Sequence, residues 1–125
     1  MDTWLIILIV VLVMSALMIG LGLLFNYKSP LKINYFIGYR TPMAMKNHET
    51  WMFANSLMGK LIWRSGAILL VGSLAALFPV IKASETTIRI VGIAIIIVHA
   101  AMLFGSIIIT EVALRKNFDR NGNRK

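Results

Sequence analysis

The sequence predicts an all-α integral membrane protein, a bundle of three transmembrane helices with a structured loop on the inner side. Two observations support this fold class. The 125 residues are 58% hydrophobic and only 14% charged, with a mean hydropathy of +0.80, whereas soluble domains are about 45–50% apolar and about 25% charged. The apolar residues also form long blocks instead of recurring at a helical period. This length suits one membrane domain, residues 1–125.

Three apolar blocks mark the expected spans. The first covers residues 4–25 without a charge, and at ~1.5 Å rise per residue such a helix crosses the ~30 Å hydrocarbon core. Its length and the preceding Asp2 favour a retained helix over a cleaved signal peptide. The second covers residues 61–81, where Arg64 near the start can extend its charge to the headgroups. The third covers residues 90–110.

The basic residues are distributed unevenly among the connecting segments. Eleven of the thirteen fall in the first loop with the start of span two, or in the tail at 115–125, and the other two are Lys82 and Arg89. Basic residues accumulate on the cytoplasmic side of membrane proteins. We therefore expect a multi-pass protein of the bacterial cell membrane with its N-terminus outside and its C-terminus in the cytoplasm. This positive-inside pattern accounts for the net charge of +8, so we expect no nucleic-acid partner.

The loop at 26–60 is long for so small a membrane protein, and long loops in compact domains are often functional. Gly38 permits a tight turn with positive φ. Thr41 followed by Pro42 is a plausible helix start, with the hydroxyl as cap and proline in the first turn. We expect an interfacial helix from Pro42 to about Lys60, either continuous with the second span or broken near Gly59.

A set of residues in this loop resembles the signature of the SdpI family of bacterial membrane proteins. The pattern is an asparagine, then a glycine, an aromatic residue, arginine and threonine, then a tryptophan and further amides. The matching positions, and the expected binding or motif residues, are Asn34, Gly38, Tyr39, Arg40, Thr41, Asn47, Trp51 and Asn55. Gly59 continues the spacing.

The resemblance implies a function. The family's named member is an immunity protein that protects a bacterium from its own secreted, membrane-lysing peptide toxin and also takes part in signalling. We therefore expect resistance to a membrane-active peptide toxin, with the toxin and the lipid bilayer as partners. The alternative is a small oligomeric transporter, channel or lipid-binding membrane subunit, in which self-association matters.

Arg40 is the motif residue with a permanent charge, and its guanidinium offers five donors in a rigid fork. At a membrane interface it can hold a lipid phosphate, pair with Glu49 or bind backbone carbonyls of the loop. A purely structural interpretation is equally open, in which the motif builds a fixed loop that closes the inner end of the bundle.

The third span carries polar residues on one narrow face, His99, Ser106 and Thr110. An ionisable residue inside the membrane is a candidate functional site because its charge is costly there. The alternative, which we favour, is a neutral His99 that hydrogen-bonds to Ser15 or Ser73 on a neighbouring helix. Glu111 is expected to pair with Arg115. Pairs of small residues four apart are candidate helix contacts: Ala16 with Gly20, Gly72 with Ala76, and Ala101 with Gly105.

Several kinds of chemistry are not expected. The adjacent His48 and Glu49 diverge on a helix, and no further ligand stands at metal spacing. The sequence has no glycine-rich phosphate loop, no nucleophile elbow and no cysteine. We expect no enzyme, no metal and no cofactor.

Overall fold

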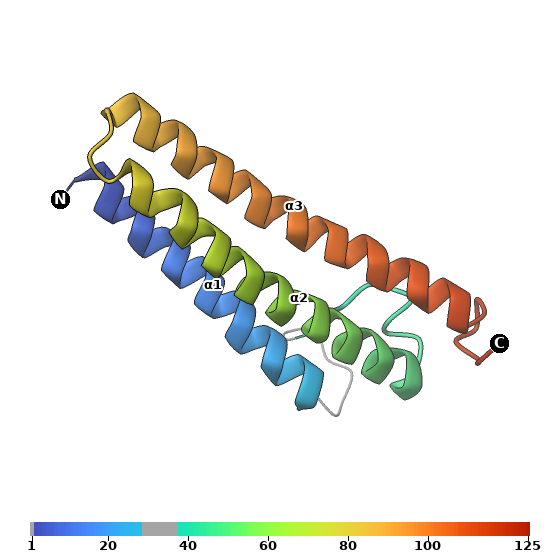
Figure 1. The fold of residues 1–125 in the computed structure, drawn as a ribbon. Coiled ribbons are helices and arrows are strands. Elements are labelled where there is room, and N and C mark those ends of the chain that lie inside the picture. Colours follow the sequence, from blue (N-terminus) through green and yellow to red (C-terminus); the bar gives the residue numbers. More distant parts are fainter. Residues whose placement is uncertain (1, 29–37) are drawn as a thin grey trace.

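The structure is a computed structural model, and it describes residues 2–28 and 38–125. These residues form three long helices, α1 (Thr3–Tyr27), α2 (His48–Leu77) and α3 (Glu85–Asn117), with a short 3-10 helix η1 (Phe78–Val80) after α2. Figure 1 shows the three long helices running lengthwise beside one another, with the N- and C-termini at opposite ends. The predicted all-α class is confirmed, and each long helix has the length and composition needed to cross a membrane.

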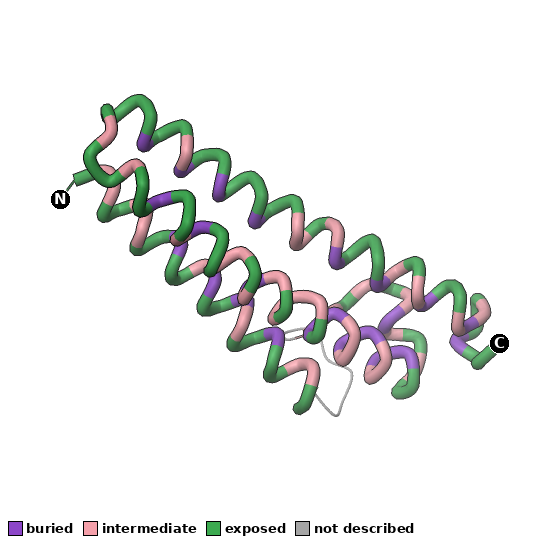
Figure 2. The backbone as a smooth tube through the Cα atoms, in the orientation of Figure 1, coloured by how far each residue is buried: buried purple, intermediate pink, exposed green. Residues whose placement is uncertain are grey.

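The outward faces of the helices are apolar. Large exposed side chains include Ile68 and Val71 on α2 and Ile90 and Ile108 on α3. Figure 2 shows the buried positions as narrow stripes between helices, with exposed positions around them. In water such a surface would be unfavourable, whereas a bilayer solvates it.

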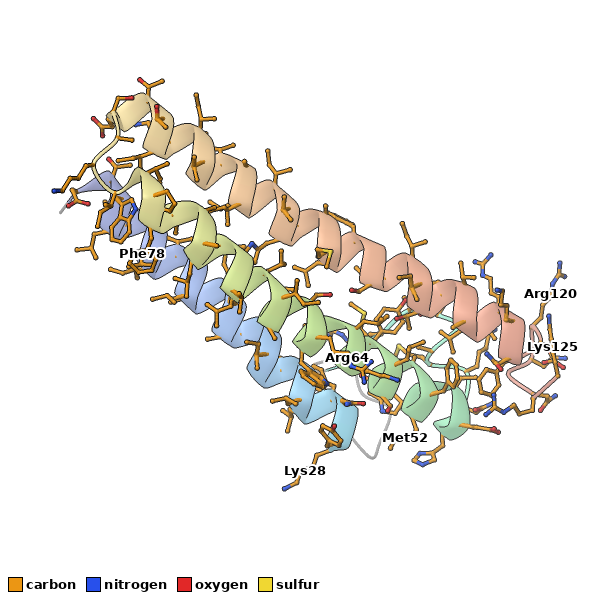
Figure 3. The ribbon with its side chains drawn as sticks, viewed as in Figure 1. Lys28, Met52, Arg64, Phe78, Arg120 and Lys125 are labelled. Atoms are coloured by element: carbon orange, nitrogen blue, oxygen red, sulfur yellow. The ribbon has the colours of Figure 1, made fainter. Side chains whose placement is uncertain are left out.

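The end of the bundle at which α1 ends, α2 begins and α3 ends is here called the motif end. Figure 3 places Lys28, Arg120 and Lys125 at this end and Phe78 at the opposite end. The opposite end is closed by two hydrogen bonds. Trp4 Nε1 donates to the carbonyl oxygen of Leu77 at 2.8 Å, and the Thr3 hydroxyl donates to Glu85 at 2.5 Å.

Helix α2 begins at His48, well before the predicted start of the second span, and continues without a break past Gly59. The prediction that Thr41 and Pro42 start a helix is wrong. Residues 42–46 form turns, in which the Ala44 amide donates to Thr41 Oγ1 at 3.3 Å, and Asn47 is the residue that caps the helix. The predicted interfacial helix is therefore the first part of α2 itself.

Helices α1 and α2 pack through glycines at which the two backbones approach closely. A Cβ atom added at Gly59 would collide with backbone atoms of Asn26, Gly22 and Phe25, and one added at Gly22 would collide with the backbone at Trp63 and Gly59. Such close approach is how small residues bring membrane helices together.

The predicted small-residue contacts are wrong for this bundle. Gly20, Gly72 and Gly105 face open space, and Ala16, Ala76 and Ala101 are exposed. Spacing four residues apart cannot say which face of an apolar helix meets its neighbour, because nearly every face is apolar.

Helix α3 is attached mainly through side chains. At the opposite end Ile95 joins a buried cluster with Val11 and Leu77. At the motif end Leu114 and Phe118 form a second cluster with Ala44 and Ala54.

Candidate functional site

The motif end is organised around Gly38, whose φ of +105° lies in the region that favours glycine. A Cβ atom there would lie 2.6 Å from Asn55 Oδ1 and 3.1 Å from the Trp51 ring. Two features therefore require glycine at position 38: the positive φ of its backbone and the indole of Trp51 that packs against it. The ring belongs to a fully buried tryptophan.

Asn55 fastens this turn to α2. Its Oδ1 accepts the Tyr39 amide at 2.7 Å, and its Nδ2 donates to the Trp51 carbonyl at 2.9 Å. The side chain is fully buried, so both ends of the amide need partners. Because Asn55 is held on α2, its hydrogen bond to the Tyr39 amide fixes the position of the loop relative to this helix.

Tyr39 carries the connection onward to α3. Its phenol donates to Glu111 Oε1 at 2.7 Å and approaches the Ile107 carbonyl at 3.3 Å. Burial, together with the hydrogen bond to Glu111 and its charge, raises the pKa of Tyr39 well above its ordinary value. The expected Glu111–Arg115 pair is not among the ion pairs of the described residues, and this carboxylate instead accepts from the Tyr39 phenol of the loop.

These contacts form one interlocked group, which we call the clasp: Gly38, Tyr39, Trp51, Asn55 and Glu111. Four of its five members are predicted motif residues. Glu111 was expected to pair with Arg115, and no pattern in the sequence links it to Tyr39. The clasp joins the loop to both α2 and α3.

Arg40 and Thr41 follow the clasp. Arg40 lies exposed on the surface of the protein. The carboxylate expected as one of its partners, Glu49, instead pairs with Arg124, with 3.2 Å between Nε and Oε1. Thr41 accepts the Ala44 amide and so shapes the turn before α2.

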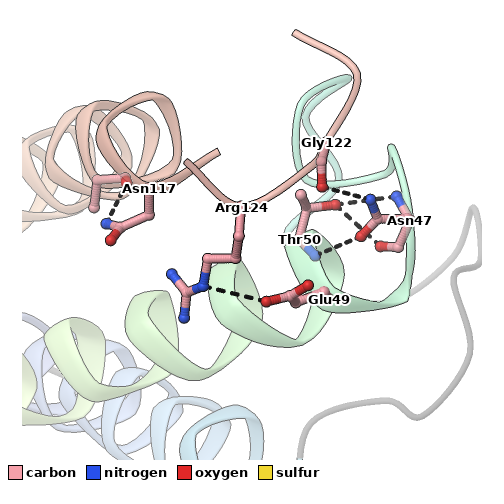
Figure 4. Close-up of polar contacts among 7 residues, drawn as sticks. Asn47, Glu49, Thr50, Asn117, Gly122 and Arg124 are labelled. Carbon is pink, nitrogen blue, oxygen red and sulfur yellow. Dashed lines mark hydrogen bonds and ion pairs between the residues drawn. The ribbon is translucent and has the colours of Figure 1, made fainter. Parts of the chain in front are cut away.

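Asn47 belongs to a second cluster, shown in Figure 4. Its Oδ1 accepts the Thr50 amide at 2.9 Å while the Thr50 hydroxyl accepts the Asn47 amide at 3.1 Å, which is a reciprocal helix cap. Its Nδ2 donates to the Gly122 carbonyl at 2.7 Å. The cap of α2 therefore also holds the C-terminal tail.

The tail at 118–125 packs against the start of α2, a contact that the sequence did not predict. Phe118 is almost fully buried and meets Phe53 edge to face, with 5.4 Å between ring centroids. The Arg124 guanidinium lies over the Phe118 ring at 4.9 Å and also pairs with Glu49. A turn closes the tail, with Gly122 at a φ of +84°. The Asn121–Gly122 pair is a recognisable turn signal in the sequence. The sequence does not show, however, that this turn packs against the start of α2.

The intramembrane polar residues lie apart from the clasp. His99 is fully buried, with Nδ1 2.8 Å from the Ile95 carbonyl and Nε2 3.1 Å from Ser15 Oγ. Because a carbonyl only accepts, Nδ1 donates, and in a neutral ring Nε2 accepts from the serine. Ser15 is thus the partner of His99, and Ser73 is not.

Ser106 and Thr110 use their hydroxyls within α3. Ser106 donates to the Met102 carbonyl, and Thr110 donates to the Ser106 carbonyl, each at 2.8 Å. Thr110 also approaches Met58 Sδ on α2 at 3.6 Å. These three polar residues of α3 share a buried face, but His99 does not contact the other two.

Asn34, the remaining predicted motif residue, lies outside the described residues. Within 2–28 and 38–125, no three histidine or acidic side chains gather as metal ligands would. In the same part of the chain, no buried side-chain nitrogen or oxygen lacks a hydrogen-bond partner. The polar groups of the clasp are therefore engaged with each other.

Comparison with known proteins identifies the family. No curated protein and no solved structure matches the chain significantly. The model of the SdpI/YfhL protein family matches residues 30–110, well over half of the chain. The match includes every predicted motif residue and ends before the tail. This protein therefore belongs to the SdpI/YfhL family, as its motif predicted.

Proposed function

We propose that this protein protects a bacterial cell against a secreted, membrane-active peptide toxin, and that it does so by binding and not by catalysis. Family membership supports the proposal, because immunity is the function that the resemblance implies. The observation that carries it is the clasp, in which four motif residues of the loop and α2 meet Glu111 of α3 at one end of a membrane bundle.

The clasp suits a binding role better than a catalytic one. Its amide, phenol and carboxylate are joined by hydrogen bonds to one another and to the backbone. A catalytic group must present a reactive atom to a substrate. A group of this kind instead fixes the relative positions of the loop, α2 and α3, and so fixes the shape that a membrane-embedded peptide meets. A signalling role would use the same end.

The proposed orientation places the motif end in the cytoplasm of the cell, with the N-terminus outside. The asymmetry of eleven basic residues against two supports it. A phosphatase reporter, active only outside, and a fluorescent reporter, active only inside, fused after Lys125 test it. The fluorescent fusion is expected to be active, and an active phosphatase fusion would reverse the arrangement.

Resistance is tested directly in cells. A toxin-sensitive bacterium expressing the protein is challenged with a panel of membrane-active peptides and with medium from toxin-producing relatives, beside an empty-vector strain. Increased survival against at least one peptide is expected. Equal survival of the two strains across a broad panel, with the protein present in the membrane, would contradict the proposal.

A second candidate function is that of a subunit in a self-associating channel, transporter or lipid-binding assembly. The open faces around Gly20, Gly72 and Gly105 favour it, since they leave small residues for contact with another copy. Native mass spectrometry in mild detergent tests this candidate, which predicts a defined oligomer. A strict monomer would contradict it.

A further inference from the structure

A cleft of about 760 Å³ opens at the motif end beside the clasp. Its walls come from three separate segments, the turns before α2, the last turns of α3 and the C-terminal tail. The residues that line it are Pro42, Met43, Lys46, Glu111, Arg115, Phe118, Asp119, Arg120 and Lys125. Part of the cleft therefore depends on the tail, which the family model does not match.

The charge of the cleft is positive. Four of the lining residues are basic and two are acidic. Within the part of the chain that the structure describes, the side chains of Lys46, Arg115, Arg120 and Lys125 form no ion pair and no hydrogen bond. Arg124 differs from these four, since Glu49 and the Phe118 ring engage it.

The two acidic residues are committed to internal bonds. Glu111 accepts from the Tyr39 phenol in the clasp. Asp119 Oδ1 accepts the amides of Asn121 and Asn123 at 2.9 and 3.0 Å and so closes the turn of the tail. The basic groups consequently face the cleft with no acidic partner, which is an arrangement suited to an anion.

The position of the cleft indicates which anion. The outward face of α3 remains apolar as far as Val112, which is 47% exposed. Arg115 follows three residues later, about 4.5 Å farther along the helix axis. Such a change from apolar to basic residues along a helix is expected where it passes from the hydrocarbon region into the headgroup region of a bilayer. Pro42, Met43 and Phe118 add an apolar wall beside the charges.

We propose that this cleft binds the phosphate headgroup of an anionic phospholipid. Arginine binds phosphate oxygens in pairs through its planar fork, and lysine adds charge without that geometry. Basic pockets beside transmembrane helices bind such headgroups. The apolar wall is expected to contact the glycerol and the upper acyl chain, which free phosphate lacks.

The proposal is tested by lipid retention. The full chain, purified in mild detergent, is mixed with phosphatidylglycerol or phosphatidylcholine, and bound lipid is counted by native mass spectrometry. The double variant Lys46→Gln with Arg115→Gln is compared with Lys60→Gln with Arg64→Gln. The two double variants lose the same charge and the same residue types, and all four positions are exposed.

We expect the cleft variant to retain about tenfold less phosphatidylglycerol than the wild type, and the control variant to match the wild type. If the cleft variant does not fold, Arg115→Gln alone should show a smaller loss in the same direction. Equal retention by cleft and control variants would overturn the site. Thermal protection by inorganic phosphate equal to that by phosphatidylglycerol would overturn the assignment to a lipid.

Discussion

The α1–α2 interface and the attachment of α3 are built in different ways. Helices α1 and α2 meet backbone to backbone at Gly22 and Gly59, where no side chain fits. Helix α3 is held by side chains, through an apolar cluster at each end, the His99–Ser15 contact and the Tyr39–Glu111 hydrogen bond. At a backbone contact an added methyl group meets atoms that cannot move aside, whereas at a side-chain contact a neighbouring side chain can change its rotamer. We therefore expect the α1–α2 interface to tolerate added volume less well than the contacts of α3 do.

The largest effect is expected at Gly59. Gly59→Ala places a methyl group against the backbone of α1, which cannot yield as a flexible side chain would. We expect it to destabilise the bundle by about 1–3 kcal/mol. Thermal unfolding in detergent measures the loss.

Gly72→Ala is the matched control, because Gly72 lies on the same helix and faces open space. It should be neutral or slightly stabilising, since alanine favours a helix more than glycine does. Equal melting temperatures for the two variants would contradict the backbone contact at Gly59.

A smaller effect is expected where α3 is tied to the clasp. Tyr39→Phe removes the phenol that donates to Glu111, and we expect a loss of about 1–2 kcal/mol at neutral pH. Tyr27→Phe is the control, because Tyr27 is 72% exposed. It should leave the stability unchanged, and a loss equal to that of Tyr39→Phe would argue against the tether.

The same tether predicts a dependence on pH. The folded protein holds the pKa of Tyr39 above its unfolded value of about 10. The stabilisation from this group is therefore complete below about pH 10 and is lost as the pH rises above it. The difference in stability between the wild type and Tyr39→Phe should narrow above pH 10. If the difference in stability stays constant above pH 10, the Tyr39 phenol does not contribute through its hydrogen bond to Glu111.

The smallest effect is expected in the tail. The Arg124–Glu49 pair is more than half exposed on each side, so the pair contributes about 0–1 kcal/mol. Contact with the two phenylalanine rings adds about 0.5–1 kcal/mol. Arg124→Ala should accordingly speed tryptic cleavage after Arg120 and lower the melting temperature less than Tyr39→Phe does.

Arg89→Ala offers a comparison, since its pair with Glu85 is similarly exposed and no aromatic contact accompanies it. It should leave the rate of cleavage in the tail unchanged. If both variants speed that cleavage equally, the tail is not held by Arg124.

The spans could be predicted from the sequence because hydropathy is a local property that acts over about 20 residues. The motif residues could be predicted from their resemblance to a family. The start of α2 could not, because Thr41 and Asn47 are both good caps. Asn47 has a local advantage in its reciprocal bonds with Thr50, and a nonlocal one in the bond from its side chain to Gly122 in the tail.

The sequence also does not show which face of each helix packs against its neighbours. Gly20 and Gly22 lie in the same apolar stretch, and only the packed bundle shows that Gly22 meets α2 while Gly20 faces open space. Arg40 is exposed, and Glu49, one of its expected partners, pairs with Arg124. Substitution of Arg40 is then expected to cost less stability than one of a buried ion pair would.

The central claim is that resistance depends on the clasp, and Asn55 tests it most directly. Asn55 and Asn117 each donate through Nδ2 to the carbonyl four residues earlier, at 2.9 and 2.8 Å. Only Asn55 also accepts the Tyr39 amide. Asn55→Ala and Asn117→Ala are expressed to equal levels in the membrane. Cell survival is then measured after challenge with a toxic peptide against which the wild-type protein protects. We expect Asn55→Ala to lose resistance and Asn117→Ala to keep it. Full protection by Asn55→Ala would contradict the claim.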